Sequence, residues 1–111
     1  MKKAIVAILL VLMTGCSKDP RAERDKYFAS AQKYLDAKKY EEASIEYRNA
    51  IRLDKGHIPS YLGIAKAFQQ MGRPQDAIAT YQEILRLDGK NVQAKLRLGE
   101  YMLIAGTRNP D

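Results

Sequence analysis

The sequence predicts an all-α fold, in which helix-turn-helix units stack on one another in an array. Three observations predict it. Residues 24–57 match residues 58–91 at an offset of 34 residues. Apolar residues recur at helical spacing within each unit, and no segment shows the alternation of a β-strand. The matched positions are Tyr27/Tyr61, Ala31/Ala65, Ala43/Ala77, Tyr47/Tyr81, Arg52/Arg86, Leu53/Leu87 and Asp54/Asp88.

The first unit, residues 22–57, contains two predicted helices joined by a turn at residues 38–40. The apolar residues of each helix recur at i, i+4, i+7 and i+8, which puts them on one face. They are Tyr27, Ala31, Tyr34 and Leu35 in the first helix and Ala43, Tyr47, Ala50 and Ile51 in the second. Gly56 is expected to adopt the left-handed conformation that often follows a helix end. The polar residues 16–21 before this unit, with Pro20, form a predicted tether.

The second unit, residues 58–91, repeats this pattern, and a third unit, residues 92–111, begins it again. Pro59 and Pro74 suit the first turn of a helix, because the missing proline N–H has no partner there. Asn91 is a predicted N-cap of the fifth helix. By the repeat offset, the third unit covers only the first helix of a pair. The apolar face of these helices comprises Tyr61, Ala65, Phe68, Ala77, Tyr81, Ile84, Leu85, Leu96, Gly99, Met102 and Leu103.

The first 15 residues have the pattern of an export signal. Lys2 and Lys3 precede an apolar run over residues 4–13, and Gly15 and Cys16 follow it closely. The run is about half as long as the roughly 20 residues that a membrane-spanning helix needs. The segment therefore predicts secretion rather than a spanning anchor.

Residues 12–16, Leu-Met-Thr-Gly-Cys, resemble the lipobox of bacterial lipoproteins, although that family more often has leucine where Met13 stands. The resemblance implies a signal peptide over residues 1–15, a diacylglycerol on the Cys16 thiol and an acylated amino group after cleavage. The alternative is that Cys16 is a small residue of an ordinary signal peptide. Several acyl chains on one residue give lasting membrane attachment, since each buried methylene contributes about 0.8 kcal/mol.

The repeated units resemble tetratricopeptide repeats, which are also helix-turn-helix units of 34 residues. The resemblance covers residues 24–106 and implies a short right-handed α-solenoid. Small residues stand where the family's helices touch, at Ala31, Ala43, Ala65, Ala77 and Gly99. Aromatic residues stand at Tyr27, Tyr34, Tyr47, Tyr61, Phe68 and Tyr81. The sequence departs from the family pattern at Lys38, Lys55, Ile84, Gly89 and Lys95.

The residues give no catalytic or metal-binding constellation, so the sequence predicts a non-enzyme without a cofactor. The one histidine, His57, has no cysteine or paired carboxylate at ligand spacing, and we expect a turn residue equivalent to Asn91. Glu41 and Glu42 are adjacent on a helix and point in different directions. Without residues 1–15 the chain has 17 basic and 13 acidic residues, which are interspersed. Nucleic-acid binding needs a concentrated basic stripe and is therefore not expected.

The resemblance implies a binding role, on the concave face that the first helix of each unit lines. The family's positions fall on Phe28, Gln32, Leu35, Leu62, Lys66, Gln69, Leu96, Glu100 and Leu103. Phe28, Leu62 and Leu96 occupy the same repeat position, and such recurrent apolar residues fit either a partner contact or core packing.

Together these features predict an envelope lipoprotein whose array holds a protein or peptide partner, as a scaffold in secretion, pilus or outer-membrane assembly, or exopolysaccharide export. Ser17, in place of aspartate, implies the outer membrane facing the periplasm, by resemblance to lipoprotein sorting. The start of the chain is also similar to repeat lipoproteins of exosortase-type systems. The alternative is a docking arm of an enzyme whose catalytic domain lies beyond residue 111. The incomplete third unit also predicts cover by a partner or self-association.

Overall fold

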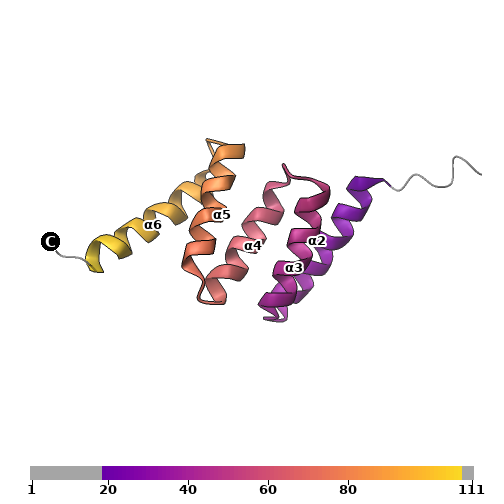
Figure 1. Cartoon of the computed structure of the whole chain (residues 1–111), viewed down its shortest axis with the longest axis horizontal. Coiled ribbons are helices and arrows are strands. Elements are labelled where there is room, and N and C mark those ends of the chain that lie inside the picture. Colours follow the sequence, from indigo (N-terminus) through magenta and orange to yellow (C-terminus); the bar gives the residue numbers. More distant parts are fainter. Residues whose placement is uncertain (1–18, 109–111) are drawn as a thin grey trace, which may run out of the picture.

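The computed structural model describes residues 19–108, which form five α-helices and no strand (Figure 1). The predicted all-α repeat fold is therefore confirmed. The predicted signal peptide, Cys16 and most of the tether lie outside the described residues. No helix in the described part is long and apolar enough to span a membrane. In chain order the helices are α2 (Pro20–Asp36), α3 (Tyr40–Leu53), α4 (Ile58–Gln70), α5 (Pro74–Leu87) and α6 (Val92–Arg108).

Helix α2 begins inside the segment predicted as tether. Pro20 occupies its first turn, and the Asp19 side chain accepts a hydrogen bond of 3.0 Å from the Arg21 N–H. Aspartate is a strong N-cap and proline a good first residue, so the two together start the helix. The predicted cap of α6 is confirmed, because Asn91 Oδ1 accepts a hydrogen bond of 2.9 Å from the Ala94 N–H.

The left-handed residues of the turns lie elsewhere than predicted. They are Lys38, with φ 60°, and Gly72, with φ 68°, and they follow α2 and α4 at equivalent repeat positions. The expectation for Gly56 is wrong, because α3 ends without a left-handed residue. Asp54 is extended there, and its Oδ1 accepts a hydrogen bond of 3.1 Å from the Gly56 N–H. The hydrogen bond from the backbone two residues on to the Asp54 side chain therefore forms the turn after α3, in place of a left-handed glycine.

The core lies where the helices of each pair meet, and it alternates small and aromatic side chains. Tyr47 and Tyr81, from the second helix of each pair, are 1% and 2% exposed. Small residues at the contact let the backbones of the two helices approach closely. The large aromatic rings pack next to these small residues. The predicted small residues of the first two units are all fully buried, at Ala31, Ala43, Ala65 and Ala77.

A glycine that the sequence analysis did not single out joins the two units. Tyr47 belongs to α3 in the first unit and Gly63 to α4 in the second, and a Cβ at Gly63 would overlap the Tyr47 ring. The Phe28 ring of α2 lies 5.9 Å from the Tyr47 ring, centroid to centroid. The contact between Tyr47 and Gly63 therefore sets how closely the second unit stacks on the first.

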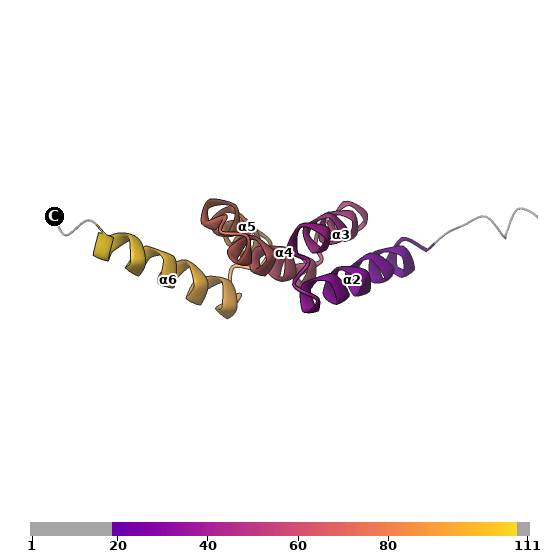
Figure 2. The same cartoon turned by 90° about the horizontal axis from the view of Figure 1, so that it is seen from below.

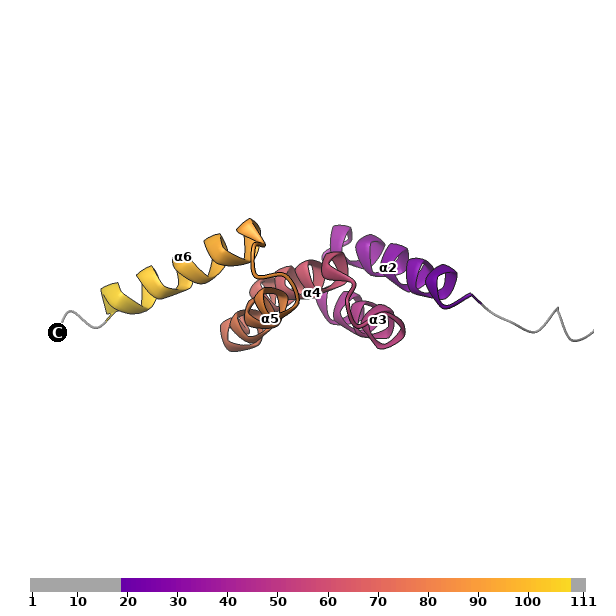
Figure 3. The same ribbon diagram turned by 90° about the horizontal axis from the view of Figure 1, so that it is seen from above.

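The stacked pairs form two layers. Helices α3 and α5 lie on one side of the molecule, and α2 and α6 lie on the other (Figure 2). Seen from above, α2 and α6 rise on either side of α4, so the layer of first helices curves along its length (Figure 3). The candidate binding residues of the sequence analysis are expected on the inner side of this curve.

Candidate protein-binding groove

The predicted residues of α2 contribute more to the core than to an open surface. Phe28 and Leu35 are partly buried against the hydrophobic core, and only Gln32 is exposed. Phe28 meets the His57 ring edge-on, with ring centroids 5.1 Å apart. The contacts of Phe28 fit the core-packing alternative, and Leu35 is likewise partly buried against the core.

The predicted residues of α4 line a groove of about 360 Å³. Tyr81 of α5 lines it too, and its hydroxyl donates a hydrogen bond of 3.3 Å to Gln69 Oε1. The other walls come from the end of α4 and the start of α6. We call this the α4–α6 groove, and its lining residues are Leu62, Lys66, Gln69, Gln70, Tyr81, Gln93 and Arg97.

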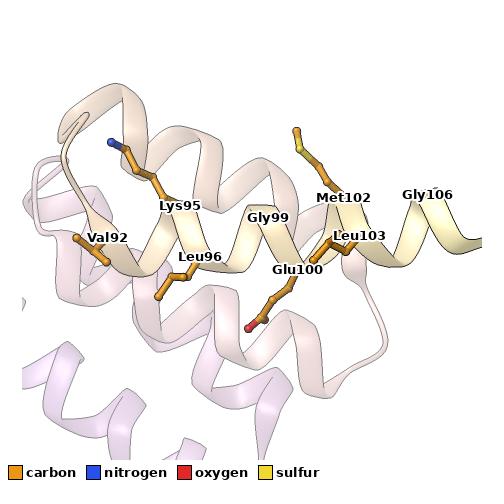
Figure 4. Close-up of a pocket in the computed structure, with 8 residues that line it drawn as sticks. All are labelled: Val92, Lys95, Leu96, Gly99, Glu100, Met102, Leu103 and Gly106. Atoms are coloured by element: carbon orange, nitrogen blue, oxygen red, sulfur yellow. The ribbon is translucent and has the colours of Figure 1, made fainter.

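The predicted residues of α6 lie on a different surface. Leu96 and Leu103 are 63% and 72% exposed, and with Glu100 they line a second, apolar hollow along α6 (Figure 4). Helix α6 contributes Gln93 and Arg97 to the α4–α6 groove instead. The nine predicted residues therefore do not form one continuous face.

The α4–α6 groove is rich in amides and carries two cationic side chains. Lys66 is exposed, and Arg97 Nη1 lies 2.9 Å from Glu100 Oε2. The hydrogen bond to Glu100 raises the pKa of Arg97. Burial raises the pKa of Tyr81, so its hydroxyl stays a neutral donor among the residues that line the groove. Gln69, Gln70 and Gln93 add amides that both donate and accept hydrogen bonds.

His57 has structural contacts at the junction of the units. Its Nδ1 lies 2.7 Å from Ser60 Oγ, and burial lowers its pKa, as does the positive charge of nearby Arg24. Arg24 also donates a hydrogen bond to Asp54, which lowers the pKa of that carboxyl group. Among the residues that the structure describes, no group of three histidine, cysteine or acidic side chains is placed to hold a metal ion. The hydrogen bond between Arg24 and Asp54 ties the start of α2 to the end of α3.

Sequence reasoning missed four residues of the groove, namely Gln70, Tyr81, Gln93 and Arg97. Gln70 directly follows the predicted Gln69, and Tyr81 was assigned to the core, where most of its ring lies. Gln93 and Arg97 lie one helical turn apart on α6, as a polar pair beside the predicted Leu96 and Glu100. That spacing was visible in the sequence, but the rotation of α6 that turns this pair toward α4 was not.

The comparison with known proteins decides the family. The tetratricopeptide repeat family profile matches residues 34–98, which is more than half of the chain. The chain belongs to the tetratricopeptide repeat family. Repeats of this family are typically interaction modules that bind protein partners. The match spans the junction of the two units and the α4 side of the groove.

Named relatives carry similar sequence over nearly the whole chain. A DnaJ protein of Oryza sativa subsp. japonica and one of Arabidopsis thaliana are each 28% identical over 108 residues, covering 94% of this chain and 20% of theirs. The type IV pilus assembly protein PilF of Pseudomonas aeruginosa is 25% identical over 112 residues, covering 91% of this chain and 44% of its own. The chain thus spans less than half of the length of the relatives it matches.

Proposed function

We propose that the protein is a non-enzymatic, lipid-anchored scaffold that holds a segment of a protein partner in the α4–α6 groove. The observation that carries the proposal is the lining of that groove. It combines one apolar side chain, Leu62, with three glutamine amides, the Tyr81 hydroxyl and two cations, Lys66 and Arg97. Polar groups that converge on a concave site can fix the orientation of a ligand and give specificity.

The bound segment is proposed to be extended and to carry a carboxylate. The glutamine amides can pair with the N–H and C=O groups of a passing backbone, which an extended peptide leaves free. Lys66 and Arg97 favour an acidic side chain, and Arg97 offers donors beyond the one that Glu100 takes. The mixed lining thereby supports selection of an acidic peptide over a basic one.

The proposed anchor is lipid on Cys16, in a bacterial envelope with the array at the outer membrane facing the periplasm. The support is the lipobox-like sequence at residues 12–16, with Ser17 next to the cysteine. The likeness to a type IV pilus assembly protein supports a role as an assembly factor. Self-association through the third unit stays a prediction, and it concerns α6 rather than the groove.

The anchor is tested by expressing the chain and a Cys16→Ser variant in a Gram-negative bacterium fed with labelled palmitate. The wild-type chain should carry label and sediment with membranes. The variant should stay unlabelled and keep the mass of its precursor. Label on the variant would refute acylation at Cys16, and it would leave the groove proposal untouched.

The groove is tested by a photo-crosslinking residue at Gln70, which lines it, with a second at the exposed Gln75 as position control. Gln70 should capture a defined protein in cells, and Gln75 should not. Arg97→Glu should then abolish that capture. The matched control is Arg86→Glu, because Arg86 also pairs with a glutamate three residues away but lies outside the groove. Equal capture from both positions, or equal loss from both charge reversals, contradicts the proposal.

A further inference from the structure

A second groove crosses the junction of the first two units, on the side of the molecule where α3 and α5 lie (Figure 2). Helices α3 and α5 form its walls and α4 forms its floor. Both units contain their full pair of helices, so the groove is complete without any residue after α5. We call it the α3–α5 groove. It has a volume of about 290 Å³, and its lining residues are Arg48, Ile51, Tyr61, Ile64, Phe68, Asp76, Ala79, Thr80 and Glu83.

The floor of the α3–α5 groove is an apolar strip. Ile64 and Phe68 of α4 are only 4% and 6% exposed, and Ile51 of α3 is partly buried against the same core. Ala79 of α5 is exposed and leaves space above them. The lining residues of α4 begin at Tyr61 and end at Phe68, which is two helical turns, or about 10 Å. The strip therefore has the length of two turns of a helix.

The rim of the α3–α5 groove carries one positive charge without a partner. Asp76 and Glu83 each pair with an arginine three residues away, with nitrogen–oxygen distances of 2.7 and 2.6 Å. The hydrogen bond from its arginine lowers the pKa of Glu83. Arg48 forms no ion pair with the residues that the structure describes. Its guanidinium lies over the Phe68 ring, 5.8 Å from the centroid, beside the apolar strip.

The lining offers little to the backbone of an extended peptide. It contains no amide side chain, in contrast to the three glutamines of the α4–α6 groove. The hydroxyl groups of Tyr61 and Thr80 donate hydrogen bonds of 2.8 and 2.7 Å to the carbonyl groups of Lys55 and Asp76. An extended segment would lose water from its N–H and C=O groups here without replacement, which is costly. A helix bonds its own backbone groups and avoids that cost.

We propose that the α3–α5 groove binds an amphipathic helix of another protein, with apolar residues at i, i+4 and i+7 on the strip and a carboxylate toward Arg48. Those three positions span the same two turns as the strip. A carboxylate opposite the unpaired guanidinium is complementary in charge. The α4–α6 groove lies on the other side of α4, so one chain can hold this helix and an extended segment at the same time.

The experiment selects the helix and then locates its site. Peptides of about 15 residues on an alanine-rich helical background, with one face randomised, are displayed on phage. The bait is the full chain in lipid nanodiscs, and empty nanodiscs remove phage that bind lipid. Enriched peptides should carry apolar residues at i, i+4 and i+7 together with an acidic residue. A fluorescent synthetic copy of the most enriched peptide should bind saturably in fluorescence anisotropy.

Two variants with matched controls locate the binding site. Ala79→Arg should abolish binding, because the long side chain fills the groove from an exposed position that the fold tolerates. Ala29→Arg is the control, since Ala29 is exposed on α2 outside the groove. Arg48→Glu should weaken binding about fivefold, the upper size for an exposed ion pair. Arg52→Glu, one turn later on α3 and outside the groove, should change it less than about twofold.

A charge exchange checks the contact with Arg48. The peptide with its carboxylate replaced by lysine should bind the Arg48→Glu chain better than it binds the wild-type chain. Failure to enrich any peptide over empty nanodiscs overturns the proposal, and so does binding that survives Ala79→Arg. Sedimentation in which the wild-type chain associates and the Ala79→Arg chain does not would assign the groove to a second copy instead. Capture at Gln70 reads the other groove, so these outcomes leave the proposed function untouched.

Discussion

Replacing Gly63 by alanine should destabilise the protein, although alanine is the better helix former. In the middle of an exposed helix the change stabilises by about 1 kcal/mol. At Gly63 the added methyl group would overlap the Tyr47 ring, which is 1% exposed and also packed against Phe28. Forcing extra volume into a packed core costs about 1–3 kcal/mol. The expected net result is a loss of up to about 2 kcal/mol.

Gly99→Ala is the matched control, because it is the same chemical change on a helix where the new Cβ meets nothing within 4 Å. Its stability should be unchanged or up to about 1 kcal/mol higher. The helix-propensity terms cancel between the two variants, so their difference isolates the overlap with Tyr47. A difference of about 1–3 kcal/mol corresponds to a gap of at least about 4 °C in melting temperature.

The assay is thermal and urea unfolding followed by far-ultraviolet circular dichroism. A double variant, Gly63→Ala with Tyr47→Leu, checks the cause, because the smaller side chain leaves room for the methyl group. In that background Gly63→Ala should cost less than it does alone. The reasoning is refuted if Gly63→Ala is as stable as Gly99→Ala, or if the cost persists unchanged without the tyrosine ring.

Further predictions concern the turns and the junction. Lys38→Gly should stabilise the fold by about 0.5–1 kcal/mol in urea unfolding, because Lys38 has φ 60° and glycine relieves that strain. Gly72→Lys should have the opposite sign, and a loss from Lys38→Gly would contradict this. Burial and the charge of Arg24 outweigh the carboxylates of Asp54 and Asp25, so the folded pKa of His57 lies below its unfolded value of about 6.5. The stability that His57 gives above that value is therefore lost as the pH falls through the folded pKa. Urea unfolding between pH 7.5 and 5.5 should show this loss in the wild-type chain and a smaller one in His57→Asn, and equal slopes would argue against it. Ala65→Trp should lower the melting temperature strongly, since Ala65 is fully buried, and an unchanged melting curve would show that the register is wrong.

The repeat made the fold predictable from the sequence. Matching residues at Ala31 and Ala65, and at Tyr47 and Tyr81, fixed both the helix pairs and the register of their contacts. Lys38 stands where the repeat family usually has a turn glycine, which was also visible in the sequence. In the structure Lys38 keeps the left-handed conformation of that turn. These features are local or periodic, so one sequence is enough to reveal them.

Features that depend on how one unit sits on the next were not predictable. Gly63 has no repeated glycine to mark it, since Ala29 and Arg97 stand at the equivalent positions. Gly56 was predicted to be left-handed because glycine often follows a helix end. In the structure the Gly56 N–H instead donates a hydrogen bond to the Asp54 side chain. The candidate groove differs from its prediction for a related reason, because the rotation of α6 decides whether Leu96 or Arg97 faces α4.

The central claim is that the second unit stacks on the first through the contact between Tyr47 and Gly63. Nuclear magnetic resonance of the full chain tests it directly. The account predicts nuclear Overhauser effects between the Tyr47 ring protons and the Gly63 α protons, with ring-current shifts of those α protons that Gly99 does not share. Gly63 α protons at ordinary shifts, with no contact to the Tyr47 ring, would contradict the stacking of the two units.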